Sequence, residues 1–138
     1  MRILRGLIGL VVAAVGLAGC GDSGGISSGP IFSVEGRVLL ASGKPLTAGR
    51  VTFVAKDGLI PPASGTIGPD GKFSLTTREL NDGAVVGDYK VRIEPPASRE
   101  GSAVRSPKFP LKYVDEDSSG LVVTVRAEPN RLDPIRLK

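Results

Sequence analysis

Apolar and polar residues alternate at a period of two in one short segment after another through the C-terminal three quarters of the chain. In the first of these segments, Val34 and Val38 share one side of an extended chain, while Glu35 and Arg37 share the other. A period of two fits a strand with one buried face and does not fit an amphipathic helix. Many of the 19 glycines and 11 prolines lie between the segments, where they favour turns. The alternation therefore restricts this part of the chain to an all-β fold.

The number and spacing of the segments predict a seven-stranded antiparallel Greek-key sandwich over residues 32–138, a fold that needs roughly 100 residues. A closed barrel is the alternative that the pattern leaves open. Pro69-Asp70-Gly71 predicts a hairpin, and Pro134 predicts an edge strand or a bulge. No helix is expected in this domain. We expect strands at 32–40, 50–55, 64–67, 72–77, 88–94, 121–126 and 131–138.

The apolar side of each expected strand gives the expected core. Tyr89 opens a strand after a turn, and we expect its hydroxyl to bond back to a main-chain group, as in the tyrosine corner of other Greek-key sandwiches. The expected core residues are Val34, Val38, Val51, Phe53, Phe73, Leu75, Tyr89, Val91, Ile93, Val123, Val125 and Leu137.

The N-terminus has the pattern of a secretory signal. Arg2 and Arg5 precede an uncharged run of about 14 residues, and the run closes on the small residues of Leu17-Ala18-Gly19-Cys20. At about 1.5 Å per residue the run covers roughly 21 Å, short of the ~30 Å hydrocarbon core of a bilayer. The sequence therefore predicts a signal peptide over residues 1–19. A signal that is cleaved without acylation and a helical membrane anchor are the alternatives.

The tetrapeptide that ends at Cys20 resembles the lipobox of bacterial lipoproteins. This resemblance implies that the Cys20 thiol is acylated and that Cys20 becomes the first residue of an exported, membrane-anchored protein. Two or three acyl chains hold a protein stably on a membrane, whereas one chain holds it only marginally. Residues 20–31 are rich in glycine and serine and are expected to form a flexible tether with a reach of roughly 17 Å.

The composition argues against catalysis. The chain contains no histidine and only one cysteine, so Cys20 is the only thiol and no Ser-His or Cys-His pair can form. We therefore expect neither an enzyme nor a cofactor. Arg2 and Arg5 supply two of the +4 formal charges, which leaves the rest of the chain at +2. That weak charge and the predicted export argue against a nucleic-acid partner.

One acidic turn has part of the pattern of a calcium loop. Asp115, Asp117 and Ser119, followed by Gly120, match the first half of the EF-hand loop. The match fails at the last ligand position, where Arg126 stands in place of glutamate. A solvated acidic turn is the favoured interpretation, and a calcium site with these three residues as ligands is the alternative.

Residues 107–113 contain the two aromatic residues that lie outside the expected strands, Phe109 and Tyr113. Exposed rings here would form a platform for a carbohydrate or a peptide. Buried rings would instead fix a long connection onto the core, as apolar loop residues often do. The second interpretation is favoured, because the nearby residues supply no polar rim for a binding site.

Turn glycines and strand apolar residues form motifs at 34–38, 43–53, 70–75, 83–84 and 86–91. Together these motifs resemble the carboxypeptidase regulatory-like domain, a transthyretin-like sandwich. Ser119-Gly120-Leu121 and Asn130-Arg131-Leu132 are similar to the forms of this domain that occur as small lipoproteins in planctomycete bacteria. The resemblance implies an accessory, non-catalytic module. We therefore expect a lipid-anchored interaction module of the cell envelope, with an envelope protein or a glycan as its partner.

Overall fold

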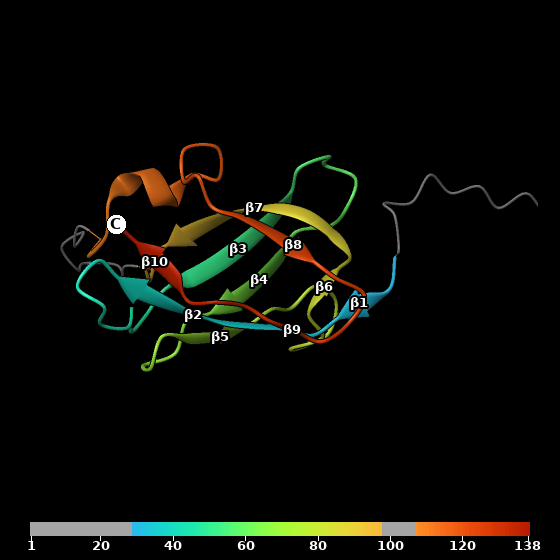
Figure 1. The fold of residues 1–138 in the computed structure, drawn as a ribbon, viewed down its shortest axis with the longest axis horizontal. Helices are drawn as coiled ribbons and strands as arrows, with labels where there is room; N and C mark the ends of the chain where they lie inside the picture. Colours follow the sequence, from blue (N-terminus) through green and yellow to red (C-terminus); the bar gives the residue numbers. More distant parts are fainter. Residues whose placement is uncertain (1–28, 98–106) are drawn as a thin grey trace, which may run out of the picture.

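The computed structural model describes residues 29–97 and 107–138. The predicted signal peptide, Cys20, most of the expected tether and residues 98–106 lie outside the described residues. The described chain is all-β, as predicted, and forms two facing sheets with a small third sheet at one end (Figure 1). Its elements are β1 (Ile31–Phe32), β2 (Val34–Leu40), β3 (Arg50–Ala55), β4 (Ala63–Thr66), β5 (Lys72–Ser74), β6 (Ala84–Val85), β7 (Gly87–Glu94), the 3-10 turn η1 (Leu111–Val114), β8 (Val122–Val125), β9 (Asn130–Arg131) and β10 (Ile135–Leu137).

One sheet is antiparallel throughout, in the order β4-β3-β7-β8. Strands β3 and β7 form its centre, and they pair along their whole facing length, from Arg50 opposite Glu94 to Ala55 opposite Tyr89. Strand β3 has the bounds that the sequence predicts. Its residues Val51 and Phe53 are fully buried, because the alternation places them on the side that faces the second sheet.

The second sheet has the order β10-β2-β5, with β9 also paired to β2. Strands β9 and β10 run parallel to β2, so the expectation of a wholly antiparallel sandwich is wrong here. The single strand expected at 131–138 is also divided, since Leu132-Asp133-Pro134 separates β9 from β10. Proline lacks the N–H that a central strand would donate, which accounts for the interruption at Pro134.

The hairpin predicted at Pro69-Asp70-Gly71 forms only in part. The Gly71 N–H donates to the Gly68 carbonyl oxygen, and the Gly68 N–H donates to the Lys72 carbonyl oxygen. The turn therefore closes as expected. Strand β4 nevertheless pairs with β3, while β5 pairs with β2 in the opposite sheet. The two strands meet again at Ser64 and Thr76, which exchange two main-chain hydrogen bonds. This contact joins the two sheets along one side of the sandwich.

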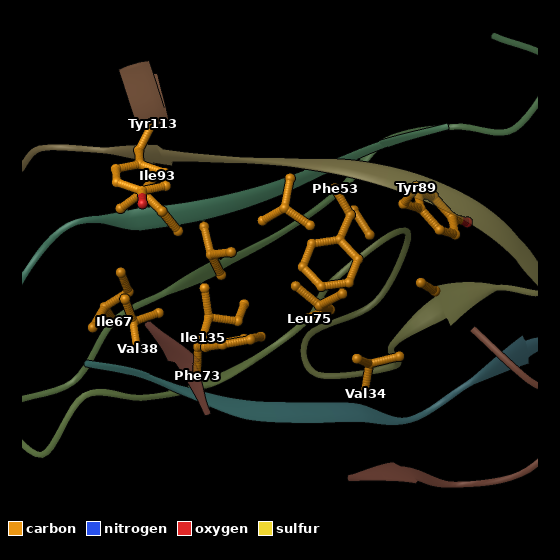
Figure 2. Packing of buried hydrophobic residues seen from close by; sticks show 14 of the residues in the cluster. Val34, Val38, Phe53, Ile67, Phe73, Leu75, Tyr89, Ile93, Tyr113 and Ile135 are labelled. Atoms are coloured by element: carbon orange, nitrogen blue, oxygen red, sulfur yellow. The ribbon is translucent and has the colours of Figure 1, made fainter. Parts of the chain in front are cut away.

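The core fills the space between the sheets (Figure 2). All of the expected core residues are buried except Val123, which is half-buried and packs against the others. The Phe53 ring lies edge-on to Phe73 of the facing sheet at 6.3 Å between centroids, and it lies 5.9 Å from Tyr89. Such aromatic pairs add roughly 0.5–1.5 kcal/mol to the stabilisation that burial itself supplies. Among the described residues, this core extends from Val34 to Leu137.

The small sheet of β1 and β6 closes one end of the sandwich (Figure 1). Ile31 pairs with Val85, so the ordered domain begins one residue earlier than predicted. Only glycine fits at position 83, because a Cβ there would overlap the Phe32 carbonyl oxygen and because the residue has φ of 106°.

The tyrosine-corner prediction is confirmed. The Tyr89 hydroxyl donates a hydrogen bond of 2.7 Å to the carbonyl oxygen of Val85, four residues earlier. Tyr89 is fully buried. Burial, with a smaller contribution from the Asp57 carboxylate, raises the pKa of Tyr89 to about 12. The hydroxyl therefore stays protonated and ties the start of β7 to β6.

Candidate functional site

The aromatic residues of the 107–113 segment do not form an open platform. Phe109 is 6% exposed and Tyr113 is 4% exposed, and both rings belong to the core cluster. Figure 2 shows Tyr113 beside Ile93 at the edge of the core. Stacking of a sugar or a peptide requires a free ring face, so the platform interpretation of these residues is wrong. The burial agrees with the alternative, in which the segment is fixed onto the core.

The Tyr113 hydroxyl also fixes the segment to the second sheet. It donates to the Lys138 carbonyl oxygen at 3.1 Å and accepts from the Lys138 N–H at 2.9 Å. The Lys112 ammonium lies 4.9 Å from the centre of the Tyr113 ring. The turn η1, which the sequence did not predict, is a single 3-10 turn closed by the Tyr113 N–H and the Pro110 carbonyl oxygen. It directs the Tyr113 ring inward while Leu111 stays exposed.

The acidic turn uses its candidate calcium ligands for its own hydrogen bonds. Asp115 Oδ1 accepts the N–H groups of Asp117 and Ser118, at 2.7 and 3.2 Å. The buried Ser119 hydroxyl donates to the Val91 carbonyl oxygen at 2.6 Å. No group of three or more His, Cys, Asp or Glu side chains suited to a metal ion occurs within residues 29–97 and 107–138. The arrangement is an acidic turn whose side chains are used in hydrogen bonds within the domain.

Two ion pairs hold this acidic turn on the outer face of β7. Lys90 Nζ lies 2.6 Å from Asp117 Oδ1, and Arg92 Nη1 lies 3.1 Å from Glu116 Oε2. The hydrogen bond to Asp117 and the charge of that carboxylate raise the pKa of Lys90. These two ion pairs position the turn, since the carboxylates of Glu116 and Asp117 each face a cation of the sheet beneath them.

A groove of about 500 Å³ lies beside β4 and β5. Main-chain hydrogen bonds join these strands at Ser64–Thr76 and Gly68–Lys72, and between the two contacts Gly65 lies so close to Ser74 that a Cβ there would overlap the Ser74 carbonyl oxygen. The lining combines hydroxyl side chains with two cations and an exposed leucine: Ser64, Thr66, Ser74, Thr76, Arg50, Lys72 and Leu80 are among its residues.

The sequence motifs did not predict this groove. Its hydroxyl residues alternate along both arms of the predicted hairpin, which is the only signal that the sequence offers. In a regular hairpin these side chains would lie over a continuous sheet. The two arms instead join different sheets, β4 with β3 and β5 with β2, and the sequence pattern does not specify those partners.

Cys20, the predicted lipidation site, lies outside the described part of the chain. Within the described ranges, the chain forms no helix with the length and apolar character that crossing a bilayer requires. Comparison with models of known protein families, with curated proteins and with solved structures finds no match.

Proposed function

We propose that this protein is a non-catalytic interaction module held on an envelope membrane by a lipid on Cys20. The observation that carries the proposal is Leu17-Ala18-Gly19-Cys20 directly after an uncharged run. Resemblance of the following domain to carboxypeptidase regulatory-like lipoproteins supports an accessory role on that membrane. The exported module would display its surfaces to envelope proteins at a short distance from the lipid.

The side chains of the domain support a role in binding rather than in reaction. The chain has no histidine, and the proposed lipid would occupy its only thiol. Two of the three carboxylates of the acidic turn, Glu116 and Asp117, are paired with Arg92 and Lys90. Within residues 29–97 and 107–138, the two sheets bury a core cluster that extends from Val34 to Leu137.

Mass spectrometry of the protein from the membrane fraction tests the anchor. We expect an acylated Cys20 as the first residue. Cys20→Ala removes the thiol that would carry the lipid, so this variant should accumulate as an uncleaved precursor. Ser23→Ala, three residues further on, is the matched control and should be processed like the wild type. An intact Met1 or an unmodified Cys20 in the native protein would contradict the proposal.

Binding of an extracellular carbohydrate is the second candidate function, and the β4–β5 groove favours it. The groove presents the hydroxyl groups of Ser64, Thr66 and Ser74 beside Arg50, a set of donors and acceptors suited to sugar hydroxyls. A glycan array tests this function directly. Thr66→Val removes an exposed groove hydroxyl at nearly constant volume and should weaken binding. The control, Thr47→Val, removes an exposed hydroxyl outside the groove. Failure of the wild type to bind any glycan would exclude this candidate.

A further inference from the structure

The two main sheets of the sandwich differ in how their edge strands are protected. The edges of β4 and β5 are joined to each other by the Ser64–Thr76 hydrogen bonds, which protects both edges from pairing with another chain. Strand β10 is short, follows Pro134, and is followed by Lys138, whose main chain is bonded to the Tyr113 hydroxyl. Short strands, prolines and covering elements are the means by which proteins prevent unwanted pairing at a sheet edge.

Strand β8 is also short, at four residues, but it contains no proline, and no described element covers its open side. It lies at the end of the β4-β3-β7-β8 sheet and pairs only with β7 (Figure 1). The segment 121–125 reads Leu-Val-Val-Thr-Val, without charge, proline or glycine. Val122 is 55% exposed. A β-branched, uncharged and exposed edge of this kind is a template for another strand.

The direction of the main-chain groups shows which atoms of β8 are free to pair. The Val91 N–H donates to the Leu121 carbonyl oxygen at 3.0 Å, so Leu121 bonds toward β7. Hydrogen-bonding direction alternates along a strand, and Val123 and Val125 therefore also bond toward β7. Val122 and Thr124 direct their N–H and C=O groups to the open side. The described part of the chain contains no hydrogen-bond partner for these groups.

We propose that β8 pairs with β8 of a second copy of this chain, antiparallel and about a two-fold axis at Val123. This register places Val122 opposite Thr124 of the second copy, and Thr124 opposite Val122. Each pair exchanges two main-chain hydrogen bonds, so all the outward-directed groups of both residues are satisfied. The pairing joins the two β4-β3-β7-β8 sheets into one continuous sheet across the dimer.

Charge complementarity favours a second copy over an unrelated strand. In the same register Arg126 lies opposite Gly120 of the second copy, next to its acidic turn. The exposed Arg126 shares the outer sheet face with Val122 and Thr124, and the acidic turn is held on that face by Lys90. The axis repeats this contact, so each cation meets an acidic turn. The Arg126 N–H already donates to Asn130 Oδ1 at 3.0 Å. The hydrogen bonds between the two β8 strands therefore end at Thr124.

Sedimentation equilibrium over a concentration series tests the dimer, with a chain of residues 21–138 that retains all of the described core residues, Val34 to Leu137. We expect the wild type to pass from monomer to dimer as concentration rises. Val122→Lys places a charge on the exposed edge and should leave the protein monomeric. Leu80→Lys, at an exposed leucine remote from β8, is the matched control and should dimerise like the wild type.

Hydrogen exchange on the wild-type protein provides a second measurement that does not depend on a variant. The amides of Val122 and Thr124 should gain protection as the dimer forms and should exchange rapidly in dilute solution. A wild type that stays monomeric at every concentration would overturn the proposal, as would an unimpaired Val122→Lys dimer. Protection of both amides at all dilutions would also overturn it, because another part of the same chain would then cover the edge.

Discussion

At the scale of single residues, Asp82 organises the turn that leads into β6. Its Oδ1 accepts the Thr77 N–H at 2.7 Å, and its Oδ2 accepts the N–H groups of Arg78 and Glu79 at 3.0 and 2.9 Å. Burial raises the pKa of Asp82, but the hydrogen bonds from the main chain together outweigh it, and the pKa is lowered from 3.8. The ionised carboxylate therefore stabilises the folded turn.

Replacement of Asp82 by asparagine should destabilise the domain at neutral pH. The neutral amide accepts weaker hydrogen bonds than a carboxylate, and we expect a loss of about 1–2 kcal/mol in the free energy of unfolding. Because the pKa is lower in the folded chain, the stabilisation is complete above 3.8 and is lost as pH falls through the lowered pKa. Urea unfolding should show the wild type and Asp82→Asn converging in acid.

Asp70→Asn is the control for this experiment. Asp70 accepts one N–H, from Lys72 at 3.1 Å, on an exposed turn. Its replacement should change stability by no more than about 0.5 kcal/mol. A difference between Asp82→Asn and the wild type that stays constant down to strong acid would show that the carboxylate charge has no part in stabilising the turn.

The sequence predicted the hydrogen-bonding direction of Tyr89 but not the role of Asp82. A buried tyrosine has to satisfy its hydroxyl, and in a sandwich corner the nearest main chain is a few residues upstream. Asp82 belongs to a dipeptide that is typical of turns, and the sequence indicated only that a turn occurs. Its three acceptor contacts depend on the path of Thr77, Arg78 and Glu79, which only the folded chain defines.

At the scale of secondary-structure elements, the alternation predicted which face of each strand is buried, but it did not predict which strands pair with each other. The inward side of β2 follows from Val34 and Val38 whichever strand lies beside it. Strand direction depends on how the chain crosses between the sheets. The connection from β8 to β9 crosses from one sheet to the other, and it makes β9 and β10 parallel to β2. No local pattern encodes that crossing.

The turn η1 acts as a clamp through Tyr113, and this role gives a prediction at the same scale. Tyr113→Phe keeps the buried ring and removes both hydrogen bonds to the main chain of Lys138. The loss should lower the free energy of unfolding by about 1–2 kcal/mol. Urea denaturation measures the effect. Leu111→Ala, at the exposed position of the same turn, should stay within about 0.5 kcal/mol of the wild type. Equal stability of Tyr113→Phe and the wild type would contradict the clamp.

At the scale of the whole molecule, the sequence was a good guide to the layers and a poor guide to the surface. Burial of one face per strand requires two facing sheets or a closed barrel around one core, and the sequence favoured the sandwich that the structure shows. The β4–β5 groove and the open edge of β8 depend on which strands end beside each other. Such features arise from the order of strands in each sheet. The motifs that predicted the strands therefore could not predict the groove or the open edge.

The two layers are stabilised as one unit, and Phe53 is where this can be tested. The residue is fully buried on β3, and its ring contacts Phe73 of the facing sheet and Tyr89 of its own. Phe53→Ala removes the ring from both layers and should cost about 3–5 kcal/mol, a large part of the 5–15 kcal/mol typical of a domain. The change should appear as a single unfolding transition at a lower temperature, because neither sheet can bury its apolar face without the other.

Val54→Ala, on the outward side of the same strand, is the control and should lower the temperature of that transition far less. Thermal unfolding followed by circular dichroism distinguishes the outcomes: a wild-type melting temperature in Phe53→Ala, or two separate transitions, would show that the sheets do not depend on a common core.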